Sequence, residues 1–246
     1  MNTTFDAIRE RSSIRRFSTA EIPEPLLVEL LELANCAPSG FNLQPWHFVL
    51  VRSRELKQLL KHIALDQPQA SEAPAVVAFA ADPNAWKTSY EEVLSLGLRT
   101  GQMSQRHVDS YRRSVKLVFW IGPFGIFGVV KKIGVLLRRL VRPTPTIVSS
   151  RQDAVQYVRA QTMLAAATFM IAAKAAGLDS SPMEGFDEER LKKLLAIPSS
   201  FTVPLLIAVG YPLDETSISN SVRLPLERKL SLDLYSNHAR ELPRKK

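Results

Sequence analysis

The chain has 246 residues, of which 46% are hydrophobic and 23% charged, and this balance excludes a wholly disordered protein. A single cysteine, Cys36, excludes an internal disulfide framework and a multi-cysteine zinc site. The net charge of +8 arises within residues 106–142, which hold nine bases and one acid, so the rest of the chain is neutral. The chain as a whole is therefore not predicted to bind nucleic acid. No secretory h-region is visible near the start, so we expect a cytoplasmic protein, or one at the cytoplasmic face of a membrane.

The hydrophobic pattern predicts a mixture of helices and strands. Strands are expected at 46–51, 75–81 and 203–209. Helices are expected at 3–10, from Pro23 to the loop at 37–40, from Ser53 to about Leu65, and at 85–108, 151–177 and 187–195, followed by a polar tail. Helices and strands do not alternate as a doubly wound sheet requires, so the pattern favours the α+β class.

Residues 110–150 form an unusual segment. Fourteen uncharged residues, 117–130, are flanked on both sides by lysines and arginines. A membrane-spanning helix needs about 20 apolar residues. The segment therefore indicates a peripheral anchor lying in a membrane interface, with Gly122-Pro123 breaking it into a helix–turn–helix hairpin. Two alternatives stay open: a lid over the active site, or packing at a subunit interface.

The common cofactor and metal motifs are absent from the sequence. No G-x-G-x-x-G follows a predicted strand and there is no P-loop. The four histidines are scattered without the spacing of metal ligands, so no metal site is predicted. Cys36 is expected to be a small buried residue.

Four polar segments remain that the core does not require. They are Arg11-Ser12-Ser13-Ile14-Arg15, the loop 38–45 (PSGFNLQP), Pro182-Met183-Glu184-Gly185, and Arg223-Leu224-Pro225. Guanidinium groups match phosphate oxygens with two parallel hydrogen bonds, and serine adds a short donor. Each segment alone is compatible with an ordinary turn.

In order and spacing the four segments resemble the nitroreductase family of FMN-dependent oxidoreductases, over about residues 3–100 and 150–230. The resemblance implies a homodimer built on a mostly antiparallel central sheet flanked by helices. Residues 1–109 and 151–246 would together form one FMN-binding domain, with 110–150 as a basic, hydrophobic insertion.

The resemblance also implies the residues that bind the flavin. The motif R-x-S-x-[RK] would hold the phosphate, ribityl chain and pyrimidine edge through Arg11, Ser12, Ser13 and Arg15. The P-S-[SG]-x-N-x-Q-P loop would reach the flavin of the partner subunit through Pro38, Ser39, Gly40, Asn42 and Gln44. The P-x-E-G-F turn would lie against the ring through Pro182, Met183, Glu184 and Gly185, and Arg223 of R-L-P would return to the phosphate.

Two positions depart from the family pattern. Ser221 stands where many members carry a second phosphate-binding lysine. Gln69 stands near the position of a Lys or Asn that commonly meets the flavin N1/O2 edge, so Gln69 is our candidate for that contact.

The implied chemistry is a ping-pong cycle in which NADH or NADPH reduces FMN, and the flavin then reduces a small organic acceptor such as a nitroaromatic or a quinone. A backbone N–H of Glu184 or Gly185 would bind flavin N5, and Arg15 would stabilise the reduced flavin. No side chain is predicted to act as nucleophile or acid. Two alternatives stay open: a flavin-binding interaction module with little catalysis, and dehalogenation or flavin fragmentation on the same fold.

Overall fold

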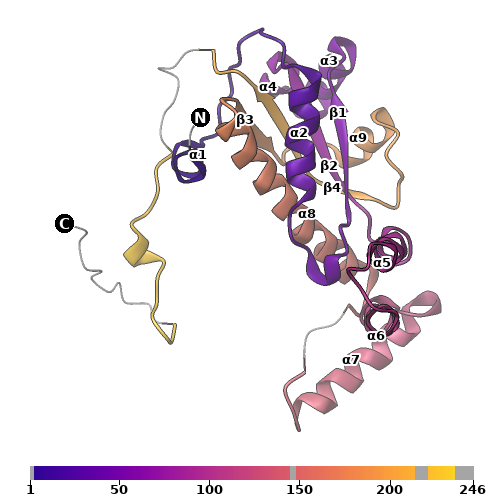
Figure 1. Ribbon diagram of the computed structural model, residues 1–246. Coiled ribbons are helices and arrows are strands. Elements are labelled where there is room, and N and C mark those ends of the chain that lie inside the picture. Colours follow the sequence, from indigo (N-terminus) through magenta and orange to yellow (C-terminus); the bar gives the residue numbers. More distant parts are fainter. Residues whose placement is uncertain (1–2, 145–147, 214–220, 236–246) are drawn as a thin grey trace.

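The computed structural model describes residues 3–144, 148–213 and 221–235 of the chain (Figure 1). Within them lies a four-stranded sheet in the order β1-β2-β4-β3, in which neighbouring strands run antiparallel. The strands are β1 (Trp46–Val51), β2 (Ala75–Ala81), β3 (Asp179–Met183) and β4 (Thr202–Gly210). The predicted α+β class with an antiparallel central sheet is confirmed.

Helices flank the sheet. In the described part of the chain the α-helices are α1 (Thr4–Glu10), α2 (Glu24–Asn35), α3 (Arg54–Ile63), α4 (Gln69–Glu72), α5 (Ser89–Arg99), α6 (Gln105–Phe119), α7 (Ile126–Arg139), α8 (Arg151–Ala175) and α9 (Glu188–Leu194). Short 3-10 helices lie at η1 (Gly40–Asn42), η2 (Pro123–Gly125) and η4 (Leu226–Arg228).

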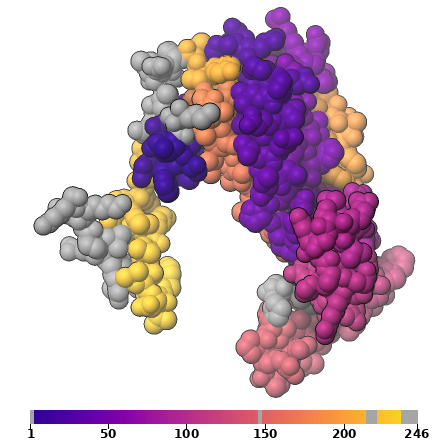
Figure 2. All heavy atoms as spheres, viewed as in Figure 1, coloured from indigo at the N-terminus to yellow at the C-terminus, as the bar shows by residue number. Residues whose placement is uncertain are grey.

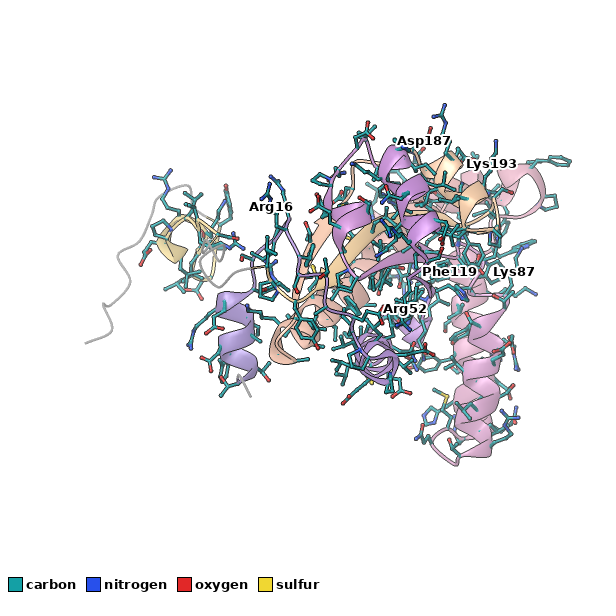
Figure 3. All side chains as sticks on the ribbon, turned by 90° about the horizontal axis from the view of Figure 1, so that it is seen from above. Arg16, Arg52, Lys87, Phe119, Asp187 and Lys193 are labelled. Carbon is teal, nitrogen blue, oxygen red and sulfur yellow. The ribbon has the colours of Figure 1, made fainter. Side chains whose placement is uncertain are left out.

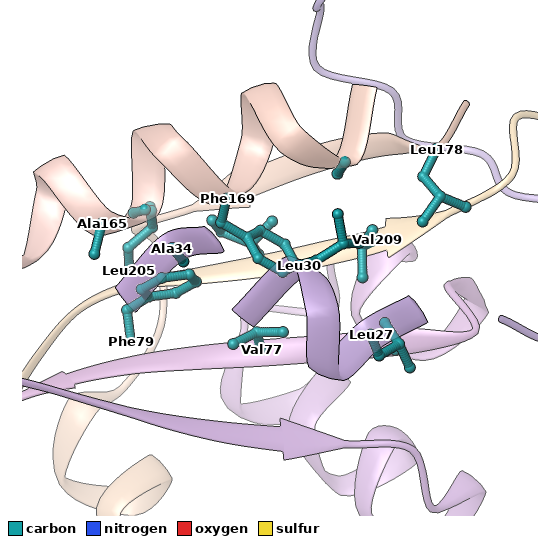
Figure 4. Close-up of a cluster of buried hydrophobic side chains, with 14 of the residues drawn as sticks. Leu27, Leu30, Ala34, Val77, Phe79, Ala165, Phe169, Leu178, Leu205 and Val209 are labelled. Atoms are coloured by element: carbon teal, nitrogen blue, oxygen red, sulfur yellow. The ribbon is translucent and has the colours of Figure 1, made fainter. Parts of the chain in front are cut away.

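Both faces of the sheet are covered, so β2 is buried throughout. β2 contributes Phe79 to one hydrophobic cluster and Ala78 to another. The first cluster lies under α2 and α8, where Phe169 meets Phe79 edge-on with ring centroids 5.7 Å apart (Figure 4). Leu60 of α3 and Leu191 of α9 belong to the second cluster. Burial on both sides explains why β2 is a continuous apolar run rather than an alternating one.

The long helix α8 is defined at both ends by local sequence. The Ser150 hydroxyl accepts a hydrogen bond from the Asp153 N–H at 3.0 Å, and the Asp153 carboxylate accepts one from the Ser150 N–H at 3.0 Å. This capping box stabilises the helix by about 1 kcal/mol. Gly177 follows the helix with φ of +80°, a conformation that glycine adopts without a Cβ penalty. The predicted helix over 151–177 is confirmed, with its end at Ala175.

Four local predictions are corrected by the structure. The helix expected over 85–108 is two helices, because Gly101 adopts a left-handed turn (φ +72°) between α5 and α6. Helix α3 ends at Ile63, since Leu65 has a φ of +56°. Strand β3 was not predicted, because residues 179–183 carry no apolar alternation. Cys36 is exposed rather than buried, at the C-terminus of α2.

Helices α6 and α7 project from one end of the molecule (Figure 2). The predicted break at Gly122-Pro123 is confirmed, but the two helices are bent by 63° instead of folding back as an antiparallel hairpin. The Lys131 ammonium donates hydrogen bonds to the carbonyls of Leu117, Val118 and Trp120 at 2.9–3.1 Å and so caps the C-terminus of α6. Within the described ranges, no single helix is long and apolar enough to cross a membrane.

Candidate active site

The first and third polar segments meet at the free edge of β3. The Ile14 N–H donates to the Ser180 carbonyl at 3.1 Å, and Ser13 pairs with Ser180 in a parallel bridge. This pairing lays Arg11 to Arg15 along β3, whose last residues begin the Pro182–Gly185 motif. Pro182 and Met183 therefore belong to a strand rather than to a turn, and Glu184 and Gly185 follow it at the surface.

A pair of glutamines approaches the same edge. The Gln67 amide donates to the Gly185 carbonyl at 2.9 Å, and the Gln69 amide donates to Gln67 Oε1 at 3.0 Å. Gln69, the predicted flavin contact, is buried and hydrogen-bonded to Gln67, whereas Gln67 itself contacts Gly185. Sequence reasoning missed Gln67, although it lies two residues from the position chosen and follows the same turn.

Several residues of these segments carry buried polar atoms without partners. Five buried side-chain polar atoms of the described residues lack a hydrogen-bond partner, and three of them are Ser12 Oγ, Ser180 Oγ and Gln69 Oε1. A buried polar group left unpaired costs about 1–3 kcal/mol, so each of these atoms calls for an explanation, and a bound ligand is one that the residue types fit. The residue types fit the polar parts of a flavin nucleotide, which offer both donors and acceptors.

The charges at the site favour an anion. Arg11 is half-buried and Arg15 is exposed beside the serines of the same segment. Asp179, which precedes Ser180, is buried, but its carboxylate is neutralised by Lys174 at 2.9 Å. Arg11 and Arg15 therefore bring two positive charges to this edge, and bidentate guanidinium contacts suit a phosphate.

The second segment forms a loop held in an unusual conformation. Phe41, Asn42 and Gln44 have φ values of +60°, +53° and +45°, a region that costs non-glycine residues about 1 kcal/mol or more each. The Ser39 hydroxyl accepts from the Gln44 N–H at 2.9 Å, and the Gln44 amide donates to Asn42 Oδ1 at 3.0 Å. Such strain persists only where the surroundings impose it, and it is common at binding sites.

Helix α8 holds this loop in place. The Gly40 N–H donates to Gln161 Oε1 at 2.7 Å, and a Cβ added to Gly40 would lie 1.9 Å from the Tyr157 hydroxyl. Phe119 of α6 packs against both Tyr157 and Phe41, with centroids 5.1 and 6.4 Å apart. Burial raises the pKa of the Tyr157 phenol. The end of α6 is therefore part of the wall around the loop.

One chain does not bring all four segments together. The loop is attached at Gln161, whereas β3 begins after the end of α8 at Ala175, a separation of about 20 Å along a helix rising 1.5 Å per residue. In Figure 3, Arg16, which is next to Arg15, and Phe119, which packs against the loop, lie in different parts of the molecule. Arg223 is exposed on the tail, which lies away from the sheet (Figure 1). Within the described residues, Pro38, Ser39, Gly40, Asn42, Gln44 and Arg223 thus lie apart from the β3 edge.

Comparison with known proteins decides the family. The nitroreductase family model matches residues 8–211. The chain belongs to the nitroreductase family. An NADH dehydrogenase of Thermus thermophilus is 32% identical over 222 residues, 90% of this chain and 92% of that protein. An iodotyrosine deiodinase of Thermotoga neapolitana is 28% identical over 214 residues, 87% of this chain and 91% of that protein.

The nitroreductase fold is shared with solved structures. A protein of Exiguobacterium sibiricum assigned as a nitroreductase, in complex with FMN, has a TM-score of 0.72 at 21% identity, covering 95% of this chain and 98% of that one. The family, the fold and the class of enzyme predicted from the sequence are confirmed. The predicted cofactors agree with the FMN of that complex and with the NADH in the name of the Thermus relative.

Proposed function

We propose that this nitroreductase binds FMN at the β3 edge and uses NADH or NADPH to reduce a small organic acceptor such as a nitroaromatic or a quinone. The observation that carries the proposal is the pairing of Ser13 with Ser180, which places Arg11 and Arg15 along the strand that leads into Glu184 and Gly185. FMN, when bound, supplies the two-electron redox chemistry.

The proposed role of the protein residues is to bind FMN and to orient it. Arg11 and Arg15 offer charge-assisted hydrogen bonds to anionic groups, each worth about 1.5–3 kcal/mol. Ser12, Ser13 and Ser180 offer hydroxyls, while Gln67 fixes the backbone at Gly185. Glu184 and Gly185, which follow β3 at the surface, would lie against the ring, whereas the side chain of Met183 is buried in the second hydrophobic cluster. No side chain is assigned as acid, base or nucleophile, because the chemistry needs none from the protein.

We propose that the complete site forms across a homodimer. The strained loop, with Pro38, Ser39, Gly40, Asn42 and Gln44, lies about 20 Å along α8 from the β3 edge of its own chain. Two copies related by a two-fold axis could bring the loop of one to the edge of the other. Arg223 is carried on a tail whose Val222 and Leu234 side chains are 94% and 81% exposed, as expected of a segment that covers a partner.

We also propose how the chain is divided into a domain and an insertion. Residues 1–109 and 151–246 would form the flavin-binding domain, and 110–150 would be an insertion. The proposed enzyme works in the cytoplasm, and the insertion would contact the inner face of a membrane.

Dehalogenation remains a second candidate. It is supported by the 28% identity to a protein named iodotyrosine deiodinase. A panel of nitroaromatics, quinones and halogenated phenols, offered to the NADH-reduced protein under anaerobic conditions, separates the two reactions by which compound reoxidises the flavin.

The flavin site is tested with two neighbouring arginines. Arg11→Ala is expected to weaken FMN binding by about 10- to 100-fold, the loss of one charge-assisted contact. Arg16→Ala, at an exposed residue outside the motif, is the matched control and should bind as the wild type does. Binding is read from flavin fluorescence quenching, and catalysis from anaerobic bleaching by NADH or NADPH. Wild-type affinity in Arg11→Ala would contradict the assignment, and a yellow protein that neither NADH nor NADPH bleaches would favour the flavin-binding interaction module.

A further inference from the structure

Helix α7 presents its apolar face to solvent. With about 100° per residue, Val129, Ile133, Leu136, Leu137 and Leu140 fall on one half of the helix. Their side chains are 54–80% exposed. An amphipathic helix on a water-soluble domain normally turns this face to the core. The exposed apolar half of α7 is therefore expected to pack against another molecule or a membrane.

The inward half of α7 is engaged with its own chain. Gly128 lies so close to the loop before α8 that an added Cβ would be 1.9 Å from the Ser149 carbonyl. Lys131 is 8% exposed and holds three carbonyls at the end of α6. These contacts fix the orientation of α7. Its apolar half is therefore exposed because the folded structure holds the helix that way, and not because the helix has come loose from the rest of the protein.

The charges of the segment are of one sign. Residues 110–150 contain eight bases and no acid. Lys132 and Arg139 lie along one border of the apolar half, and the exposed Arg138 lies on the other side of the helix. The exposed Arg142 follows the end of α7. Leucine, isoleucine and valine on one half, with lysine and arginine on the other, is the pattern of helices that lie in a membrane interface.

The turn before α7 continues the apolar surface. Phe124 is fully exposed at the tip, and the neighbouring Trp120 is 40% exposed. Tryptophan is enriched at the level of lipid headgroups. Both residues belong to the end of the molecule formed by α6 and α7, which stands clear of the sheet (Figure 2). Ile133 and Leu136 border a cavity shared with Val148 and Tyr157, whereas the exposed Val129, Leu137 and Leu140 do not line it.

We infer that α7 lies in the plane of an anionic lipid bilayer. Ile133, Leu137 and Leu140 enter the boundary between headgroups and acyl chains, and Lys132 and Arg138 meet lipid phosphates. Helix α7 spans about 21 Å, less than the roughly 30 Å of a bilayer's hydrocarbon core, so α7 by itself is too short to cross it. The inference deepens the proposed membrane contact and is independent of the proposed flavin chemistry.

The test uses co-sedimentation of the FMN-loaded full-length protein with two kinds of vesicle, phosphatidylcholine alone and phosphatidylcholine with phosphatidylglycerol. Wild type should sediment with the anionic vesicles, and less as salt is raised. The triple variant Ile133→Gln/Leu137→Gln/Leu140→Gln should reduce the partition coefficient by at least about tenfold. Arg138→Gln/Arg142→Gln should reduce it by up to about 30-fold on anionic vesicles only, as two charges near such a surface allow.

A matched control removes two charges elsewhere. Arg54→Gln/Lys193→Gln changes exposed bases of α3 and α9, and it should sediment as the wild type does. Flavin content and bleaching by NADH report folding and the proposed chemistry separately. The inference is overturned if wild type stays in the supernatant with both vesicles while retaining FMN, or if the triple variant sediments normally. It is also overturned if, without vesicles, the wild type is an oligomer and the triple variant is a monomer. The apolar face of α7 would then pack against a second copy of the chain.

Discussion

Gly40→Ala is expected to damage the loop that approaches the active site, by a mechanism that can be isolated. Gly40 has an ordinary negative φ, so the substitution introduces no backbone strain. The difficulty is space: the new Cβ would lie 1.9 Å from the Tyr157 hydroxyl and 3.2 Å from Cζ of the same ring. Tyr157 cannot easily retreat, because its ring packs against Phe119.

The magnitude follows from two terms. Forcing a methyl group into a packed contact costs about 1–3 kcal/mol. Moving the loop away also breaks the 2.7 Å hydrogen bond from the Gly40 N–H to Gln161, which contributes about 0.5–1.5 kcal/mol. The free energy of unfolding should therefore fall by about 2–4 kcal/mol. Tyr157→Phe removes the clashing oxygen, so the double variant should recover about 1–2 kcal/mol of that loss.

Urea unfolding, followed by tryptophan fluorescence, measures the free energy of unfolding of each variant. All variants are compared at one protein concentration, because the apparent stability of an oligomer depends on protein concentration. Gly134→Ala is the control: it lies within α7 with no atom within 4 Å of the added Cβ, and should be neutral or stabilising by up to about 1 kcal/mol. Equal midpoints for Gly40→Ala and wild type would refute the reasoning. So would strictly additive effects of Gly40→Ala and Tyr157→Phe, since no contact would then link them.

Three further changes test other contacts. Lys131→Met should lower the free energy of unfolding by about 1.5–3 kcal/mol through loss of the cap on α6, whereas Lys132→Met, at an exposed position, should change it by less than about 0.5 kcal/mol. Hydrogen bonds from Ser149 and the neighbouring serine hold the pKa of Asp153 below its ordinary value, so its stabilisation is complete at neutral pH and disappears as pH falls through that lowered pKa. Asp153→Asn should accordingly be less stable than wild type in urea at neutral pH and similar to it in strong acid; a constant difference would contradict this. Lys174→Met leaves a buried carboxylate unpaired and should cost about 3–5 kcal/mol in thermal or urea unfolding, and a neutral effect would show that the pair is not buried in solution.

The sequence predicted those elements whose pattern is set locally. β1 and β2 have the predicted limits, because each is an apolar run bounded by turn residues. β3 could not be predicted, since its mostly polar residues, Asp179 to Met183, become a strand only through pairing with β4. The helix over 85–108 was wrong because periodicity continues through Gly101, and only its positive φ ends the first helix.

In the candidate site, too, some features could be predicted from the local sequence and others depend on the folded structure. The four polar segments could be found from residue types and spacing, and the pairing of Ser13 with Ser180 brings two of them together. Which glutamine touches Gly185 depends on the turn at Leu65 and Asp66, both with φ of +56°, and no pattern predicted that turn. The contacts of Tyr157 and Gln161 with Gly40 could not be predicted either, because nothing in the sequence of α8 distinguishes these two residues from other polar residues of a helix.

In the proposed dimer, α8 works as a molecular ruler. Its N-terminal half holds the loop that serves one flavin, and its C-terminal end leads into the β3 edge that serves the other. The spacing between the two redox centres is then set by the number of residues in this one helix. Inserting or deleting a single residue between Gln161 and Ala175 would shift the two half-sites by about 1.5 Å and rotate them by about 100° relative to each other. The described length of α8 is thus expected to tolerate substitutions far better than changes in length.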